Sequence, residues 1–232
     1  MLGGGAALLT LPALAQNPPG LKTLAAAKDL TFGSAAATYE LKAADLVSVL
    51  LREAAILVPE YEMKRGILEP RPGQYDFTAL DALFAFARRG GLAMRGHPLV
   101  WHAANPPWLD GALAARRDAT ILTGHIQTLM RRYRMASVDV VNEAIAPDGN
   151  GLRPSPWLTA FGPGYVDMAF FAAAEADPRA LRVYNDWGCE QGAPVNDRFR
   201  AATLKFLDGL LARHVPVQAL GLQGHLAAFG PH

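Results

Sequence analysis

Two patterns of apolar and polar positions alternate along the chain after residue 28. Short apolar runs indicate β-strands, whereas longer segments with apolar residues three and four positions apart indicate amphipathic helices. The predicted strands cover residues 30–35, 55–59, 92–96, 138–142, 181–185 and 217–222. The predicted helices cover residues 41–52, 77–89, 116–133, 165–176 and 197–213, with Asp197 as the cap of the last one. This alternation predicts a single domain of βα units around a parallel sheet.

The composition is that of a globular protein that can bury a large core. Of the 232 residues, 51% are hydrophobic and 19% are charged. The 22 lysines and arginines balance 21 acidic residues, so a net charge of +1 gives no reason to expect a nucleic acid or a membrane surface as partner. The single cysteine, Cys189, cannot form an internal disulfide and is too few for a thiolate metal site.

The first residues have the character of an export signal. Residues 2–15 are uncharged and mostly apolar, and they end in Ala13-Leu14-Ala15, a small-x-small pattern that signal peptidase accepts. We therefore expect a signal peptide remnant at 1–15, a linker at 16–28, a catalytic domain at 29–232, and a secreted or periplasmic protein. No lysine or arginine precedes the apolar run, and a disordered or core-packed N-terminal segment is the alternative. The run is too short to span a bilayer.

Polar and aromatic residues follow the predicted strands at their carboxyl ends, which favours one α/β architecture over another. A doubly wound sheet would carry a glycine-rich phosphate loop, and neither G-x-G-x-x-G nor G-x-x-x-x-G-K-[ST] occurs. A β/α barrel instead gathers its chemistry at the strand ends. The residues at these ends are Glu60, Lys64, His97, Trp101, Asn142, Glu143, Asn185, Asp186, Trp187, Gln223 and His225. The tryptophans offer flat apolar faces that suit sugar rings, so a carbohydrate is the expected ligand.

Four motifs at these strand ends carry a family resemblance. They read Arg95-Gly-His-Pro-Leu-Val-Trp-His102, Asp139-Val-Val-Asn-Glu143-Ala, Tyr184-Asn-Asp-Trp187 and Gly221-Leu-Gln-Gly-His225-Leu. In order and spacing they resemble the family 10 glycoside hydrolases, the retaining endo-1,4-β-xylanases. The resemblance implies a TIM (β/α)8 barrel, with about six βα units in this chain, and hydrolysis by two glutamates without metal or cofactor. It implies xylan or xylo-oligosaccharides as partners, and we expect a monomer.

The resemblance assigns the central role to Glu143, the acid/base. Such a residue protonates the leaving oxygen and then, as a carboxylate, activates water. Asn142 matches a residue that hydrogen-bonds the sugar 2-hydroxyl. On the two residues alone, a loop salt bridge for Glu143 and a helix cap for Asn142 are the alternatives.

The remaining site residues are also assigned by resemblance. His97 and Trp101 hold the sugar beside the cleavage point, Glu60 and Lys64 bind the more distant glycone sugar, and Gln223 accompanies His225, which orients the nucleophile. Trp187 either stacks on the leaving sugar or packs against the barrel. His102 is expected to be structural, because a metal site at His97 and His102 would lack a third ligand.

The sequence departs from the family pattern at several positions. Tyr61 stands in place of the usual Asn, Arg65 in place of the usual Trp, and Ala104 in place of a frequent Gln, so the preference for xylose over glucose is open. The nucleophilic glutamate of the family follows the seventh strand, and no carboxylate follows Asp208 here. We therefore expect the chain to stop before the seventh strand and to lack the nucleophile. A β-glucan-active barrel glycosidase and a non-catalytic xylan-binding fragment are the alternatives.

Overall fold

A single parallel sheet organises the described part of the chain, residues 18–226 of a computed structural model. The strand order is β1-β2-β3-β5-β6-β7, and β4 pairs with β5 outside this path. The strands are β1 (Gly33–Ala36), β2 (Ile56–Pro59), β3 (Ala93–Gly96), β4 (Val100–Trp101), β5 (Ser137–Asn142), β6 (Leu181–Asp186) and β7 (Ala219–Leu222). All six predicted strands are confirmed, and β4 is an addition of two residues that was not predicted.

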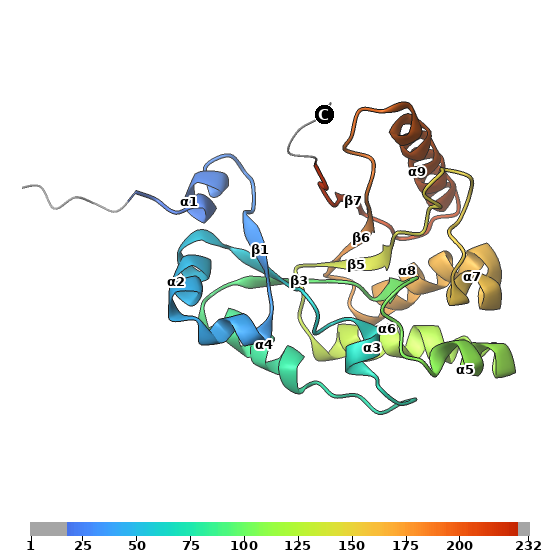
Figure 1. Cartoon of the computed structure of the whole chain (residues 1–232), viewed down its shortest axis with the longest axis horizontal. Coiled ribbons are helices and arrows are strands. Elements are labelled where there is room, and N and C mark those ends of the chain that lie inside the picture. The colour runs from blue at the N-terminus through green and yellow to red at the C-terminus, as the bar shows by residue number, and fades with distance from the viewer. Residues whose placement is uncertain (1–17, 227–232) are drawn as a thin grey trace, which may run out of the picture.

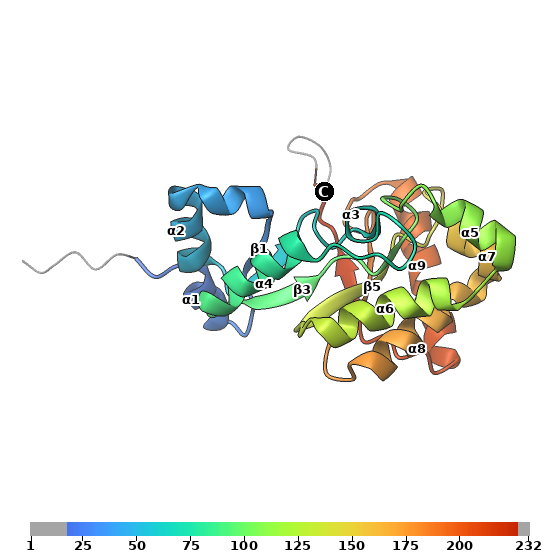
Figure 2. The same ribbon diagram turned by 90° about the horizontal axis from the view of Figure 1, so that it is seen from below.

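Helices connect the strands and cover the outer side of the sheet (Figure 1). They are α1 (Leu21–Ala26), η1 (Thr38–Lys42), α2 (Ala44–Glu53), α3 (Arg65–Leu68), α4 (Thr78–Arg89), α5 (Leu109–Arg116), α6 (Thr120–Arg132), α7 (Pro156–Phe161), η2 (Gly162–Gly164), α8 (Tyr165–Ala176) and α9 (Pro194–Ala212). Figure 2 shows α4, α6 and α8 along one side of the strands, and α4 contacts β2 and β3 while α8 contacts β5 and β6. Every residue of β5 is buried.

Three helix predictions need correction. The helix predicted over 41–52 begins as the 3-10 turn η1 and continues as α2. The helix predicted over 116–133 begins only at Thr120, as α6, because the left-handed Arg117 with φ of 49° ends a separate helix, α5, which was not predicted. The last helix begins at Pro194 with Ala193 at its cap, so Asp197 lies in the first turn and binds Arg200 rather than capping the helix.

The sheet is open in the described part of the chain, with β1 and β7 at its two edges (Figure 1). Because consecutive strands lie side by side and all pair in parallel, the architecture is a β/α half-barrel. The region predicted as a linker contains α1, which is held to α2 by a hydrogen bond of 2.6 Å from Lys22 Nζ to the carbonyl of Leu51. The predicted signal peptide at 1–15 lies outside the described residues, and secretion stays a prediction. No described helix is both long enough and apolar enough to cross a bilayer.

Gly96 allows a close approach of side chains beneath the end of β3. A Cβ atom at this position would collide with Met135 Sδ and would lie 2.9 Å from both Met63 Cε and Val138 Cγ2. All three neighbours are buried, so they have little room to move.

We expect Gly96→Ala to lower the free energy of unfolding by about 1–3 kcal/mol, because it overpacks this part of the core. The matched control is Gly124→Ala in α6, where a Cβ atom would meet no neighbouring atom within 4 Å. This control should raise stability by up to about 1 kcal/mol through helix propensity. Urea unfolding followed by tryptophan fluorescence measures both variants, and a Gly96→Ala protein as stable as the parent would contradict the packing described here.

Candidate active site

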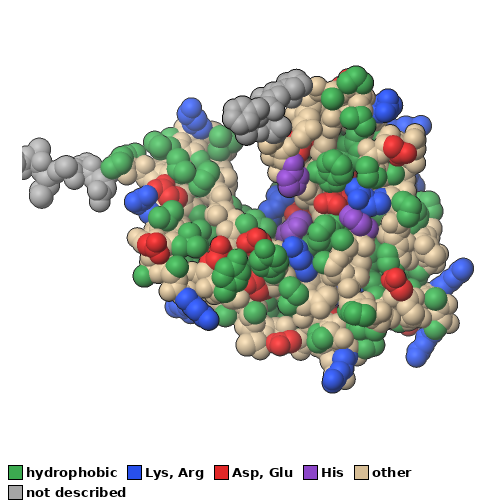
Figure 3. All heavy atoms as spheres, in the orientation of Figure 1, with side chains coloured by type: hydrophobic (Ala, Val, Ile, Leu, Met, Phe, Trp, Pro, Cys, Tyr) green, Lys and Arg blue, Asp and Glu red, His purple; other side chains and the backbone are tan. Residues whose placement is uncertain are grey.

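The carboxyl ends of the strands bring most of the predicted site residues together. Figure 3 shows a notch between the α1–α2 side and the α9 side of the molecule, with histidine side chains gathered beside it. Glu143, Asn142, Gln223 and His225 form one connected hydrogen-bonded group at the ends of β5 and β7. Trp187 lies apart from that group, against α9.

Glu143 follows β5 in a strained backbone conformation. Its φ of 56° is in the left-handed region, which a residue with a long side chain seldom adopts. The conformation is held by a hydrogen bond of 2.8 Å from its amide to the carbonyl of Asn185 in β6. Its side chain is 12% exposed. Strain of this kind is concentrated at functional sites, so the geometry favours a working carboxyl over a loop salt bridge.

Amide side chains fix the carboxyl group of Glu143. Gln223 Nε2 donates to Glu143 Oε1 at 3.1 Å and to Asn142 Oδ1 at 3.2 Å. Asn142 Nδ2 donates to Glu143 Oε1 at 3.3 Å, and Asn185 Nδ2 donates to Asn142 Oδ1 at 2.8 Å. His225 Nε2 lies 2.9 Å from Gln223 Oε1 and so extends the same network to an exposed position. Asn142 is therefore a member of a side-chain network and not a helix cap.

His102 lies between Glu143 and Arg153. Its Nδ1 is 3.7 Å from Glu143 Oε2, and its Nε2 is 3.4 Å from Nη1 of Arg153. Burial and the positive charge of Arg153 lower the pKa of His102, against the opposing charge of Glu143. Because a guanidinium can only donate, the neutral ring accepts at Nε2 and carries its proton on Nδ1, facing the carboxyl group. His102, predicted to be structural, thus contributes to the surroundings of Glu143.

His97 is held by Asp139, a buried carboxylate that also pairs with the partly exposed Arg95. Asp139 in β5 binds Arg95 of β3 through Oδ1, and its Oδ2 lies 2.8 Å from His97 Nδ1. This contact fixes the orientation of the imidazole ring. The His97 side chain is 22% exposed, so the ring can still contact a ligand.

Trp101 and Lys64 together form a wall beside Glu143. The Trp101 carbonyl accepts hydrogen bonds from Trp157 Nε1 at 2.8 Å and from Asn105 Nδ2 at 3.0 Å. Lys64 Nζ lies 5.7 Å from the Trp101 ring centroid and 4.8 Å from that of Tyr61. Lys64 makes no ion pair or hydrogen bond through Nζ within residues 18–226, so the ammonium group is free for a ligand.

Arg65 lies beneath this wall rather than on it. The residue is 6% exposed, and its guanidinium lies 5.3 Å from the Trp108 ring and 5.5 Å from the Trp157 ring. It pairs with Glu69 at 2.8 Å. Arg65 therefore cannot contact a sugar directly, and its effect on the cleft acts through the tryptophans that it supports.

Trp187 packs against α9, as one of its two predicted alternatives requires. Its ring is stacked on Phe199 with centroids 6.0 Å apart, and it remains half-buried. The preceding Asp186 is fully buried and accepts hydrogen bonds from the Tyr184 hydroxyl and the Trp187 amide. Burial raises the pKa of Asp186 to about 6, against these two hydrogen bonds. Both partners of the Asp186 carboxyl lie within two residues of it at the end of β6, which agrees with a structural role.

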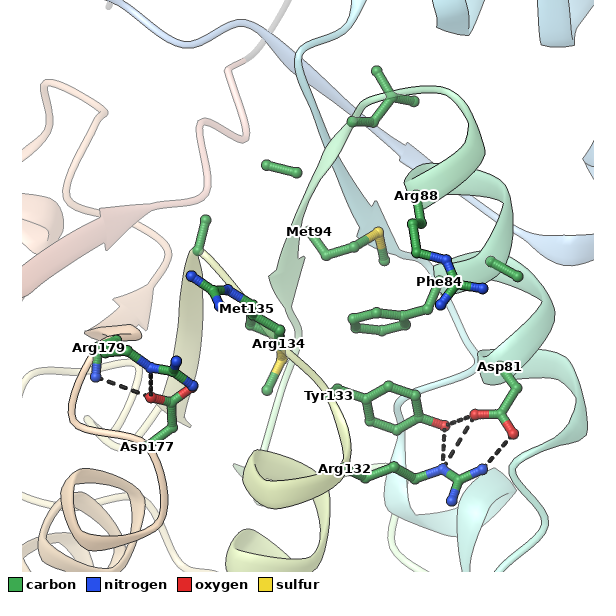
Figure 4. A pocket seen from close by; sticks show the side chains of 14 residues that line it. Asp81, Phe84, Arg88, Met94, Arg132, Tyr133, Arg134, Met135, Asp177 and Arg179 are labelled. Atoms are coloured by element: carbon green, nitrogen blue, oxygen red, sulfur yellow. Dashed lines mark hydrogen bonds and ion pairs between the residues drawn. The ribbon is translucent and has the colours of Figure 1, made fainter.

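The described residues contain no cluster of three or more His, Cys, Asp or Glu side chains placed to hold a metal ion. A hollow of about 940 Å³ lies elsewhere, between α4 and the amino ends of β3, β5 and β6 (Figure 4). Two of its four arginines, Arg132 and Arg179, are already paired with Asp81 and Asp177. Because β/α barrels carry their chemistry at the opposite strand ends, this hollow is not the candidate site.

Two residues that contact the site, Asp139 and Arg153, were not given a role from the sequence. Asp139 could have been noticed, because a lone acid within a fully buried strand requires a partner. Arg153 lies in a loop with no pattern around it, and only the fold brings it within reach of His102.

The fold and the gathering of polar residues at the strand ends are those of a TIM-barrel protein. The model of Glycosyl hydrolase family 10 matches residues 20–232, and the chain belongs to this family. Endo-1,4-beta-xylanase A of Caldicellulosiruptor sp. (strain Rt8B.4) is 36% identical over 201 residues, which cover 80% of this chain and 28% of the relative. Beta-1,4-xylanase of Dictyoglomus thermophilum is 36% identical over 174 residues, which cover 73% of this chain and 47% of the relative.

Solved structures agree with the barrel fold. Xylanase XynB from Paenibacillus barcinonensis superposes with a TM-score of 0.82 at 31% identity and covers 94% of this chain and 66% of its own. Native xylanase 10B from Thermotoga maritima superposes with a TM-score of 0.80 at 32% identity. The match covers 89% of this chain and 64% of the solved chain. The predicted fold class and family are thereby confirmed. The chain spans half or less of the two curated relatives and about two thirds of the two solved chains.

A buried polar cluster around His125 and Glu69 makes the stability of the protein depend on pH. His125 Nδ1 lies 3.1 Å from the Tyr75 hydroxyl and 3.5 Å from Glu69 Oε2. Burial lowers the pKa of His125 from 6.5 to about 4, against the hydrogen bond that the Glu69 carboxylate accepts from its ring. Hydrogen bonding to His125 and the charge of Arg65 overcome burial and lower the pKa of Glu69 to about 2.

We expect the free energy of unfolding to fall between pH 6.5 and 4.5, because the unfolded chain protonates His125 while the folded protein does not. At about 1.4 kcal/mol per pKa unit, this residue contributes roughly 2–3 kcal/mol over that interval. His125→Gln should flatten the curve by that amount, whereas His214→Gln at an exposed position should not change it. Urea unfolding at pH 7, 5.5 and 4.5 measures this, and equal slopes for the parent and His125→Gln would refute the assignment. Glu69 acts in the same direction, but only below pH 4.5.

Proposed function

We propose that this chain forms the glycone side and the acid/base side of a retaining endo-1,4-β-xylanase site. In this proposal Glu143 donates a proton to the leaving glycosidic oxygen and then, as a carboxylate, takes a proton from the attacking water. The observation that carries the proposal is the left-handed Glu143, fixed by Asn142 and Gln223 and faced by His102 Nδ1 at 3.7 Å. The names of the relatives support xylan as the substrate.

The other residues take roles that follow their positions along the strand ends. His97 and Trp101 hold the sugar next to the cleaved bond, and Asn142 contacts its 2-hydroxyl. Glu60 and Lys64 hold the next sugar, and Lys64 Nζ is free to do so. Gln223 and His225 lie on the far side of Glu143, where His225 would orient a nucleophile. Phe199 covers part of the Trp187 ring, and the uncovered part faces the leaving sugar.

We further propose that the nucleophile is not among these residues. Within residues 18–226 the side chains that hydrogen-bond or pair with Glu143 are His102, Asn142 and Gln223, and none of them is a carboxylate. A retaining mechanism needs a second carboxylate about 5–5.5 Å from the first. In this proposal residues 18–226 bind xylo-oligosaccharides but do not hydrolyse them by themselves.

Binding is tested by isothermal titration calorimetry with xylobiose and xylotetraose. Trp101→Ala should weaken binding of both about tenfold, because the sugar loses its stacking surface, and Trp101→Phe should retain most of the affinity. Phe171→Ala is the control, since Phe171 is 50% exposed on α8 and away from the strand ends. A parent protein that binds neither sugar would refute the proposed cleft.

Turnover is tested with aryl xylobiosides that carry a good or a poor leaving group. We expect no release of either aryl group above the uncatalysed rate, from the parent or from Glu143→Ala. Release by the parent that Glu143→Ala reduces far more for the poor leaving group would contradict the missing nucleophile and would support Glu143 as the acid.

A β-glucan remains the second candidate substrate, because two positions differ from the xylanase pattern. Tyr61 is 42% exposed at the end of β2, and the exposed Ala104 has a left-handed backbone and no polar side chain. Affinity electrophoresis in xylan and in carboxymethyl-cellulose separates the two. Stronger retardation by carboxymethyl-cellulose would favour the glucan.

A further inference from the structure

The hollow at the amino ends of β3, β5 and β6 has the size of a pocket for a small molecule. Its volume is about 940 Å³. Pockets that bind small molecules usually measure roughly 300–1,000 Å³. The hollow is lined by α4 and by the segments that lead into the three strands (Figure 4). Glu143 follows the carboxyl end of β5, so the hollow and the candidate active site lie at opposite ends of the sheet.

The floor of the hollow is apolar and contains polarisable groups. Met94 in β3 and Met135, which precedes β5, are buried in it, and the half-buried Phe84 of α4 also lines it. The Phe84 ring packs against the ring of Tyr133, with centroids 4.3 Å apart. Thioethers and aromatic rings both make favourable contacts with a further aromatic ring. The floor therefore suits an aromatic ring better than a simple inorganic ion.

The two acidic residues of the hollow already have partners. Asp81 in α4 pairs with Arg132 and also accepts a hydrogen bond of 2.7 Å from the Tyr133 hydroxyl. Asp177 pairs with Arg179 at 3.0 Å and accepts a hydrogen bond from the Arg179 amide at 3.0 Å. The charges of the two aspartates and their two arginines cancel, so these four residues leave the hollow neutral.

Two further arginines give the hollow its net positive charge. Arg88 in α4 and Arg134, which follows α6, are exposed residues of its lining. Within residues 18–226 neither guanidinium forms an ion pair or a hydrogen bond, and we call these two residues the free arginines. Figure 4 shows them on either side of Met94. A guanidinium binds a carboxylate through two parallel N–H···O bonds, so the free arginines are suited to a carboxylate ligand.

We propose that this hollow binds a small aromatic carboxylate, whose ring lies on Met94 and Met135 and whose carboxylate pairs with the free arginines. An exposed ion pair contributes little by itself, because water and salt screen it. Burial of the ring over the floor supplies the apolar part of the affinity, and the arginines select for negative charge. The inference is separate from the proposed function, because the two sites lie at opposite ends of the sheet.

Calorimetry at pH 7 and low salt tests the site with 2-naphthoate as the probe. We expect one saturable site per chain, and Arg88→Gln/Arg134→Gln should weaken binding about tenfold because the carboxylate loses both partners. The matched control is Arg89→Gln/Arg131→Gln, which removes the same charge from exposed positions outside the hollow. This control should bind within about twofold of the parent. 2-Naphthamide, which has the same rings without the charge, should bind about tenfold more weakly than 2-naphthoate.

Methyl resonances of methionine locate the probe in the protein. In a sample labelled at its methionine methyl groups, saturating 2-naphthoate should shift the Met94 and Met135 signals upfield, because these side chains lie under the face of the ring. Met63, which packs at Gly96 nearer the carboxyl end of β3, should keep its signal. Shifts confined to other methionines would overturn the site.

The remaining outcomes separate this site from its alternatives. Equal affinity of the parent and of Arg88→Gln/Arg134→Gln, or of 2-naphthoate and 2-naphthamide, overturns the role of the arginines and with it the proposal. Inorganic phosphate that binds as tightly as 2-naphthoate overturns the role of the apolar floor. Sedimentation that shows a dimer of the parent and a monomer of the variant would assign this face to a second copy of the chain and would also overturn the proposal. None of these results bears on xylobiose binding, so the proposed function is tested independently.

Discussion

The register of β5 against its neighbours is the constraint on which the candidate site depends. Residues three apart on a regular strand point to opposite faces, yet Asp139 and Asn142 both reach polar partners inside the sheet. The pairing of β5 with β6 shifts between Asp139 and Val141, and this irregularity turns the two side chains to the same side. A Cβ atom on Gly221 would contact both Asn185 and Arg95, so the two sets of partners occupy one region.

Satisfaction of buried polar groups then fixes what lies above. Asn142 is 2% exposed, and an unpaired carboxamide at that depth would be costly. It is satisfied from β6 by Asn185 and from β7 by Gln223, and Gln223 also reaches Glu143. Three neighbouring strands therefore have to be in place before the Glu143 carboxyl group is positioned. Gly221 is important because it has no side chain. A Cβ atom at this position would displace the amide of Asn185 from the network.

The sequence was sufficient for the strands, the barrel class and most of the residues around Glu143. Strand periodicity is a local signal, and parallel strands place their carboxyl ends together whatever the details of the connections. Elements of two to six residues, such as β4, α3 and α7, were not predicted. Segments this short do not show a hydrophobic periodicity. The break between α5 and α6 depends on one left-handed arginine, Arg117, which no propensity favours at that position. The roles of His102 and Arg153 depend on a contact across 51 positions, which periodicity does not reveal.

The two sides of Glu143 differ in how firmly they are built. On the glycone side, the Trp101 carbonyl is bound by Trp157, the Trp108 indole donates to the Glu69 carbonyl, and Arg65 lies between the two supporting indoles. On the other side, His225 is exposed, and its side chain is held by Gln223 alone among the described residues. A rigid wall favours ligands whose shape it matches, because less ordering accompanies binding. Under the proposed function, selection among sugars belongs to the side of β2 and β4, whereas the side of β7 contributes chiefly to positioning the Glu143 carboxyl group.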